Sequence, residues 1–220
     1  MQRVAIYTAV FGGYDAPLPQ PACPGVDYIC FTDAPGADTP ANWRIEPRRA
    51  RYQHPRMSAK WFKMRPDVEL RSYRYTIWID GNLQITTDTF AAQLLDVLNP
   101  SGLALFRHPD RNKVVDEVAA SAPIRKYGGL PLAEQVKHYE RRGYPDTNGL
   151  YACGVLVRDG AVPRIRRLNR NWMRENERWT YQDQLSLPYL LWKLRMEPGI
   201  IPYNLWDNPL FGFVPHASDL

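Results

Sequence analysis

An apolar run that ends in Asp-Gly-Asn constrains this chain more than any other stretch. The residues from Tyr75 to Ile79 are β-branched or aromatic, which predicts a buried strand. Asp80 and Asn82 follow it, separated by a glycine. An acid at the carboxyl end of a central strand lies where α/β sheets bind ligands, and two oxygen-bearing side chains one residue apart can hold a divalent cation. The same residues are also ordinary turn chemistry, so this motif alone leaves both interpretations open.

The length and composition are those of one ordinary globular domain. The 220 residues carry a formal net charge of +5, three cysteines without metal-type clustering and no apolar run long enough to cross a membrane. We therefore expect a single domain over residues 1–220 with reduced, mostly buried thiols. A cytoplasmic location is expected because the amino terminus enters a strand pattern at once. The positive charge favours a polyanionic partner such as a nucleotide, a nucleic acid or an anionic membrane.

Strand and helix patterns alternate along the chain, which predicts an α/β fold with a mostly parallel central sheet flanked by helices. Strands are expected at Arg3–Val10, Val26–Phe31, Trp43–Glu46, Tyr75–Ile79, Gly102–Phe106 and Leu150–Val157. Helices are expected at His54–Met64, Asp88–Leu98, Asn112–Tyr127, Leu132–Arg142, Ala161–Glu177 and Asp183–Leu194. The last helix should start late or kink at Pro188. The tail from residue 201 should wrap over the body of the domain.

Two further segments carry candidate chemistry. Small residues and glycines follow the first strand, including Gly12, and would let a nucleotide approach the backbone while Tyr14 stacks on its base. The spacing matches neither a Walker loop nor a dinucleotide fingerprint. Asp183 and Gln184 open a helix, where an acid is either a first-turn residue favoured by the helix dipole or a group that faces a sugar.

The order of these motifs resembles that of GT-A glycosyltransferases. The chain is similar in particular to a glycosyltransferase-like family of bacteria and plant Golgi proteins, long catalogued as a domain of unknown function and related to retaining family-eight enzymes. The segments that carry the resemblance are Ser58–Lys63, Ile77–Asn82, Phe106–Arg111, Gly149–Tyr151 and Asp183–Ser186. It implies a single-domain, Rossmann-like GT-A fold. It also implies metal-assisted, retaining transfer of a sugar from a nucleotide-sugar donor, a uridine diphosphate sugar, to a glycan or other acceptor.

The resemblance also implies roles for individual residues. Asp80 and Asn82 take the place of an Asp-X-Asp motif for Mn²⁺ or Mg²⁺, and His216 is the candidate histidine ligand near the C-terminus. Asp183 and Gln184 become the catalytic candidates beside the sugar. The donor-binding candidates are Thr8, Ala9, Gly12, Tyr14, Asp33, Lys60, Lys63, Asp80, His108 and Gly154.

Several alternatives stay open. Lys60 and Lys63 would neutralise a diphosphate in an enzyme, or lie on a solvated helix face. The arginines between residues 164 and 178 are expected on the solvated face of an amphipathic helix. His108, Arg111 and Glu117 form a further cluster toward the acceptor, for which the sequence gives no role. A nucleic-acid base could be the acceptor instead of a glycan, since positive charge suits it. The chain could also bind nucleotide sugars without catalysis, because the amide at position 82 weakens the charge at the metal.

Overall fold

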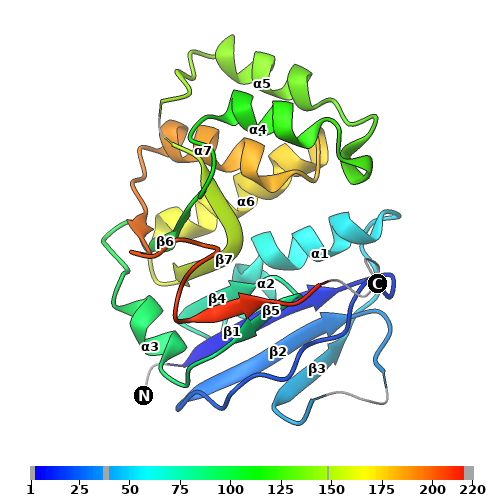
Figure 1. Ribbon diagram of the computed structural model, residues 1–220, viewed down its shortest axis with the longest axis vertical. Helices are drawn as coiled ribbons and strands as arrows, with labels where there is room; N and C mark the ends of the chain where they lie inside the picture. Colours follow the sequence, from blue (N-terminus) through cyan, green and yellow to red (C-terminus); the bar gives the residue numbers. More distant parts are fainter. Residues whose placement is uncertain (1–2, 37–39, 148, 216–220) are drawn as a thin grey trace.

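A seven-stranded sheet forms the centre of the molecule (Figure 1). The computed structural model describes residues 3–36, 40–147 and 149–215. The strands are, in spatial order, β3 (Trp43–Pro47), β2 (Val26–Thr32), β1 (Val4–Val10), β4 (Tyr75–Ile79), β7 (Tyr151–Asp159), β6 (Leu103–Arg107) and β8 (Gly199–Ile200). A separate antiparallel ribbon pairs β5 (Leu83–Ile85) with β9 (Phe211–Phe213).

Strand β7 runs against the direction of its neighbours. β1 pairs in parallel with β2 and β4, β2 with β3, and β6 with β8, whereas β7 is antiparallel to both β4 and β6. The predicted α/β fold with a mostly parallel central sheet is therefore confirmed. The reversal brings the start of β7 beside the end of β4, where the amide of Asp80 donates to the carbonyl of Gly154 over 2.9 Å.

The two faces of the sheet bury separate cores, because successive strand residues point to opposite faces. Along β1, Ala5, Tyr7 and Ala9 enter one core, while Ile6 and Val10 enter the other. Helices that contribute to the first core are α1 (Pro55–Met64), α4 (Val114–Ser121), α5 (Leu132–Glu140), α6 (Pro163–Arg178) and α7 (Asp183–Leu194). A short helix, α2 (Pro66–Glu69), links α1 to β4. The second core is covered by α3 (Phe90–Leu95) and the β5–β9 ribbon.

Some element boundaries differ from the sequence prediction. The helix expected over Asn112–Tyr127 ends at Ser121 and is followed by a separate 3₁₀ turn, η1 (Arg125–Tyr127). Pro123 accounts for the break, because it has no backbone N–H to donate to the preceding turn, while Ala122 before it still has helical dihedral angles. Of the two alternatives for the last helix, the late start was wrong, since α7 begins at Asp183 and continues through Pro188, and the kink at Pro188 stays a prediction. The sequence pattern predicted neither α2 nor the ribbon strands.

Other expectations hold for the described residues. The three cysteines are buried free thiols. On α6, Ile165, Leu168 and Trp172 are buried, and the arginines between residues 164 and 178 are exposed. The tail contributes Ile201 and Phe211 to the second core, as expected of a wrap over the body. Within these ranges no helix has both the length and the apolar character needed to cross a lipid bilayer.

Candidate active site

A cleft of about 600 Å³ opens where β1 and β4 end. Its walls come from the turn after β1, from α1 and α4, from the starts of β7 and α7, and from the C-terminal segment. This is the edge at which open α/β sheets bind ligands. The predicted site residues that line the cleft are Ala9, Gly12, Tyr14, Lys60, Lys63, Asp80, His108, Gly154, Asp183 and Gln184.

The other predicted residues do not line it. Thr8 is fully buried within β1. The main-chain carbonyl of Asn82 accepts from the amide of Val214 over 2.8 Å, and its side chain is not part of the cleft lining. Asp33 contacts Gly12, which lines the cleft, but does not line it itself. His216 lies outside the described residues.

Asp33 shapes the turn after β1 instead of lining the cleft. Its carboxylate accepts from the amide of Gly12, with distances of 3.0 Å to Oδ1 and 3.3 Å to Oδ2. Gly12 has a φ of +71°, and a Cβ there would lie 2.7 Å from Cγ of Pro55. Only glycine combines this backbone conformation with such close packing against the start of α1. The hydrogen bonds to Asp33 and the close packing of Gly12 on Pro55 therefore fix the conformation of this turn at the cleft.

An ion-pair network, which we name the charged wall, joins α1, β4 and α7; it consists of Lys60, Lys63, Trp78, Asp80 and Asp183. The ammonium of Lys63 lies 2.7 Å from Oδ2 of Asp183 and 3.3 Å from Oδ1 of Asp80. That of Lys60 lies 2.6 Å from the same Asp183 oxygen. The indole of Trp78 donates to Oδ1 of Asp80 over 2.7 Å. Lys63 therefore connects the two carboxylates that the sequence had predicted to share a site.

Helical and strand periodicity explain why these side chains meet. Lys60 and Lys63 are three residues apart on α1 and so project from one face of that helix. Trp78 and Asp80 are two residues apart along β4 and its end, and alternation places them on one side of the sheet. Asp183 is the first residue of α7, and its carbonyl accepts from the buried indole of Trp172 over 3.1 Å. Packing of α6 against α7 thus fixes the acid that closes the network.

Two groups of the charged wall, Asp183 and Lys63, have their charged forms favoured despite burial. Burial alone would raise the pKa of Asp183, but Lys60 and Lys63 outweigh it and hold the pKa well below its usual range. Burial also opposes the charge of Lys63, which is 2% exposed, yet the carboxylates of Asp183 and Asp80 raise its pKa above the ordinary value. For Lys60 burial prevails over the attraction of Asp183, and its pKa is lowered. The solvated-face alternative is therefore wrong for Lys63.

A second polar cluster adjoins the wall. Glu117 on α4 accepts from Nε of Arg111 over 2.6 Å, from the hydroxyl of Ser121 over 3.0 Å and from the amide of Gln182 over 2.9 Å. Nδ1 of His108 accepts from the backbone amides of residues 110 and 111, each over 3.1 Å. Burial, followed by the charge of Arg111, lowers the pKa of His108. Gln182 caps α7 directly before Asp183, so this cluster positions the start of that helix.

The mouth of the cleft carries exposed apolar side chains, which we name the apolar rim: Ile124, Trp206 and Phe213. They line the cleft and are 44%, 61% and 36% exposed, respectively. The rings of Trp206 and Phe213 lie 5.2 Å apart, and the indole of Trp206 donates to Asp110 over 3.4 Å. A group of exposed apolar side chains at one place is typical of a binding surface, whereas single exposed apolar residues are ordinary.

The sequence analysis missed Trp78, Gln182 and the apolar rim. The two-residue spacing from Trp78 to Asp80 was an available signal, since alternate residues share a strand face. Gln182 was visible as the residue before the helix-opening acid, where side chains cap helices. Trp206 and Phe213 had no comparable local signal; Phe213 is positioned by the β5–β9 ribbon, and Trp206 lies in the segment before β9.

Comparison with known proteins gives three findings. The family model described as TOD1/MUCI70, glycosyltransferase-like domain, matches residues 39–209. The probable hexosyltransferase MUCI70 of Arabidopsis thaliana is 29% identical over 124 residues, which cover 51% of this chain and 21% of that protein. The chain thus spans about a fifth of the length of this curated relative. The solved structure of the WbbM bifunctional glycosyltransferase aligns with a TM-score of 0.47 and 13% identity over 89% of this chain and 37% of that one.

Proposed function

The chain belongs to the TOD1/MUCI70 glycosyltransferase-like family, and from that premise we propose that it transfers a sugar from a nucleotide-sugar donor to a carbohydrate acceptor. The family resemblance read from the sequence is confirmed by the match over residues 39–209. The observation that carries the proposal is the charged wall, in which Lys63 joins Asp80 to Asp183 inside one cleft. The family resemblance further suggests a uridine diphosphate sugar as the donor.

Asp80 is the residue best suited to the diphosphate side. Its side chain is 42% exposed, and a Cβ on Gly154 would lie only 3.4 Å from its Oδ2, so glycine keeps this approach open. Magnesium is commonly bound by one or two carboxylates together with substrate phosphates. Asp80 fits such a site, whereas the described residues contain no cluster of three His, Cys, Asp or Glu side chains able to hold a metal. A bound Mg²⁺ or Mn²⁺ would supply positive charge to the departing diphosphate.

Asp183 is suited to electrostatic stabilisation beside the sugar. Two ammonium groups lie within 2.7 Å of its Oδ2, which makes the carboxylate a weak nucleophile but leaves a negative centre near an oxocarbenium-like sugar. Gln184 is an amide, donates to the carbonyl of Tyr151 over 3.2 Å, and is also a poor nucleophile. We therefore favour front-face transfer with retention: the acceptor oxygen bonds to the anomeric carbon, the bond to the phosphate oxygen breaks, and that phosphate takes the acceptor proton.

The apolar rim suits a carbohydrate acceptor. An aromatic ring can cover the apolar face of a pyranose, while Asp110 beside Trp206 offers an acceptor for hydroxyl groups. The exposed arginines of α6 account for much of the chain's positive charge, and among the described residues they do not line the cleft. The net charge therefore gives no specific support to a nucleic-acid acceptor.

A donor screen tests the proposal. The purified chain is incubated with Mn²⁺ and a panel of nucleotide sugars, with and without simple oligosaccharides, and released nucleoside diphosphate is measured. We expect slow release with one donor and faster release when a suitable acceptor is added. If no donor gives release and none stabilises the chain against thermal unfolding, the transferase proposal is overturned. Stabilisation without release would favour the non-catalytic alternative.

A further inference from the structure

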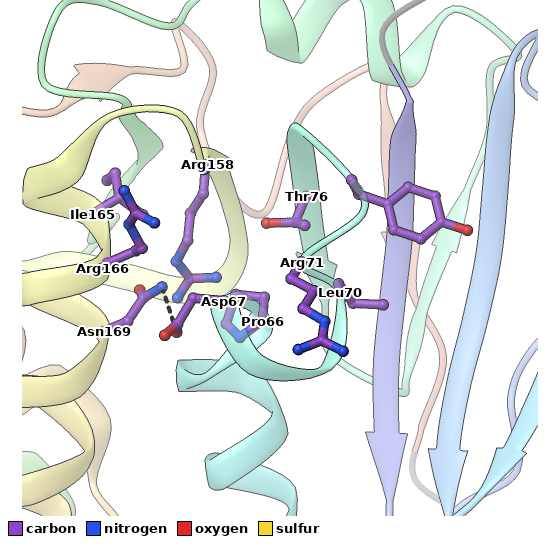
Figure 2. Close-up of a pocket in the computed structure, with 11 residues that line it drawn as sticks. Pro66, Asp67, Leu70, Arg71, Thr76, Arg158, Ile165, Arg166 and Asn169 are labelled. Atoms are coloured by element: carbon purple, nitrogen blue, oxygen red, sulfur yellow. Dashed lines mark hydrogen bonds between the residues drawn. The ribbon is translucent and has the colours of Figure 1, made fainter.

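A second cavity lies near the start of β4 and the end of β7 (Figure 2). Its volume is about 80 Å³, and α2, β4, β7 and α6 contribute to it. It shares no lining residue with the cleft. Thr76 and Arg158 are direct partners in the β4–β7 register, so both side chains point to the sheet face that α2 and α6 cover.

Arg158 brings a buried positive charge to this cavity. It is 1% exposed, and Figure 2 shows its side chain extending from β7 toward Asn169 and Asp67. Nη1 donates to the hydroxyl of Tyr7 over 3.1 Å. Its Nε and Nη2 are buried without a hydrogen-bond partner among the described residues. A guanidinium keeps its charge and has only donors, so leaving these two unpaired is costly. The cavity therefore requires an acceptor, and a negatively charged one is favoured.

Asn169 contributes an unpaired hydrogen-bond acceptor to the cavity, whereas Arg158 contributes unpaired donors. Its Nδ2 donates to Oδ1 of Asp67 over 3.2 Å, and because a carboxylate only accepts, this contact fixes which way the amide faces. Its Oδ1 is then buried, again without a partner in the described part of the chain. A ligand that satisfies this cavity must accept from Arg158 and donate to Asn169.

The surrounding charge is positive. Arg71 and Arg166 line the cavity and are exposed, which places them at its mouth. Asp67 is the acid in the lining, and Arg65 already holds it through contacts of 3.2 and 3.1 Å. The cationic side chains at the cavity thus outnumber its carboxylate.

We propose that this cavity binds a phosphate group that keeps one P–OH. The phosphate oxygens accept from Nε and Nη2 of Arg158, and the P–OH donates to Oδ1 of Asn169. A volume of about 80 Å³ exceeds the share of two liquid waters, at ~30 Å³ each, and suits one tetrahedral oxyanion but not a nucleotide. Sulfate carries no proton at neutral pH and would leave the Asn169 oxygen unpaired. The site is independent of the glycosyltransferase proposal.

Calorimetric titration of the full chain tests the site. The probes are inorganic phosphate, glucose 1-phosphate and sulfate, at matched ionic strength and at a mildly acidic pH where phosphate carries a proton. We expect a phosphate probe to bind roughly tenfold more tightly than sulfate, because sulfate leaves a buried acceptor unpaired. The tighter phosphate probe identifies whether the source is the free ion or a monoester. Arg166→Ala should weaken phosphate binding severalfold.

Arg167→Ala is the matched control, since Arg167 is the exposed neighbour on α6 and does not line the cavity. Arg166 and Arg167 are exposed, so these substitutions should leave the chain folded, and the test needs no substitution of the buried Arg158. Three results overturn the proposal: no binding of either phosphate probe, equal affinity for phosphate and sulfate, or equal weakening by Arg166→Ala and Arg167→Ala.

Discussion

The charged wall of the cleft pairs its ions with one another around two buried groups, Lys63 and Asp183, whereas the side chains of the apolar rim are exposed to solvent. On the wall, Lys63 is 2% exposed and touches two carboxylates. On the rim, Trp206 is 61% exposed and pairs with Phe213 and Asp110. The wall belongs to regular elements packed in the core, while the rim sits on the C-terminal segment and the loop after α4.

This difference separates two tasks within one cleft. A network of fixed ions can stabilise charge that develops during a reaction without reorganising, because its dipoles and charges are already in place. An exposed ring makes contact through its surface and adapts to the ligand that covers it. We therefore expect substitutions on the wall to affect turnover and stability, and substitutions on the rim to affect acceptor affinity.

The largest expected effect comes from Asp80→Ala. Loss of this carboxylate should reduce transfer and donor hydrolysis roughly 10²–10³-fold, the range seen when one electrostatic group is removed from an active site. Lys63 keeps its contact with Asp183, so circular dichroism should show an intact fold. Turnover is measured with the best donor from the screen. Asp88→Ala is the control, since Asp88 is an exposed acid outside the cleft; undiminished turnover in Asp80→Ala would contradict the assignment.

The next effect is on folding and concerns Lys63→Met. Without Lys63, Asp80 loses its ammonium partner and the buried carboxylate of Asp183 keeps only Lys60, which should cost up to about 3–5 kcal/mol of the free energy of unfolding. Lys60→Met is the matched comparison and should cost less, because Lys60 is 21% exposed and Asp183 keeps Lys63. Urea denaturation measures both. Equal losses in the two variants would show that Lys63 has no special place in the network.

A smaller effect is expected on the rim. Trp206→Ala should raise the KM for the acceptor about threefold to tenfold, since one aromatic contact contributes about 0.5–1.5 kcal/mol. Donor hydrolysis without acceptor should stay unchanged, because the charged wall is untouched. Tyr203→Ala is the control: Tyr203 is 40% exposed on the same segment but does not line the cleft. A matching fall in donor hydrolysis would mean that the rim also serves the donor.

The sequence predicted the wall better than the rim because local periodicity carries information about regular elements. The sequence showed the apolar run before Asp80 and the position of Asp183 at the start of a helix. Both residues line the cleft. The burial of Lys63 could not be predicted in this way, because it depends on α1 packing against β1 and α6, which are distant in the sequence. On the rim, Phe213 depends on a ribbon whose strands are three residues each, too short for a reliable pattern.

Arg158 shows a different limit of sequence reasoning. The strand was expected to end at Val157, one residue before Arg158. In the structure β7 continues to Asp159, and Arg158 is buried within it. A buried arginine looks like a surface residue in sequence, since charged side chains are almost never fully buried without a partner. The cavity beside it could be recognised only from the fold.

The smallest predicted effect concerns His108, which lines the cleft and contacts Arg111 and Glu117. Burial and then Arg111 lower the pKa of His108, so the folded protein binds this proton only at a lower pH than the unfolded chain, whose histidine titrates at about 6.5. The contribution to stability is therefore complete above that pH. It is lost as pH falls toward the folded pKa, with a slope of at most about 1.4 kcal/mol per pH unit.

His108→Asn should flatten this dependence, because the asparagine oxygen can still accept the backbone amides that Nδ1 receives but does not titrate. The measurement is the free energy of unfolding in urea between about pH 7.5 and pH 5 for both proteins, in the range where histidine titrates. Since the pKa of His138 is also lowered by burial, some slope must remain in the variant, and only the difference between the two curves reports on His108. Parallel curves would show that His108 takes up its proton as readily in the folded protein as in the unfolded chain.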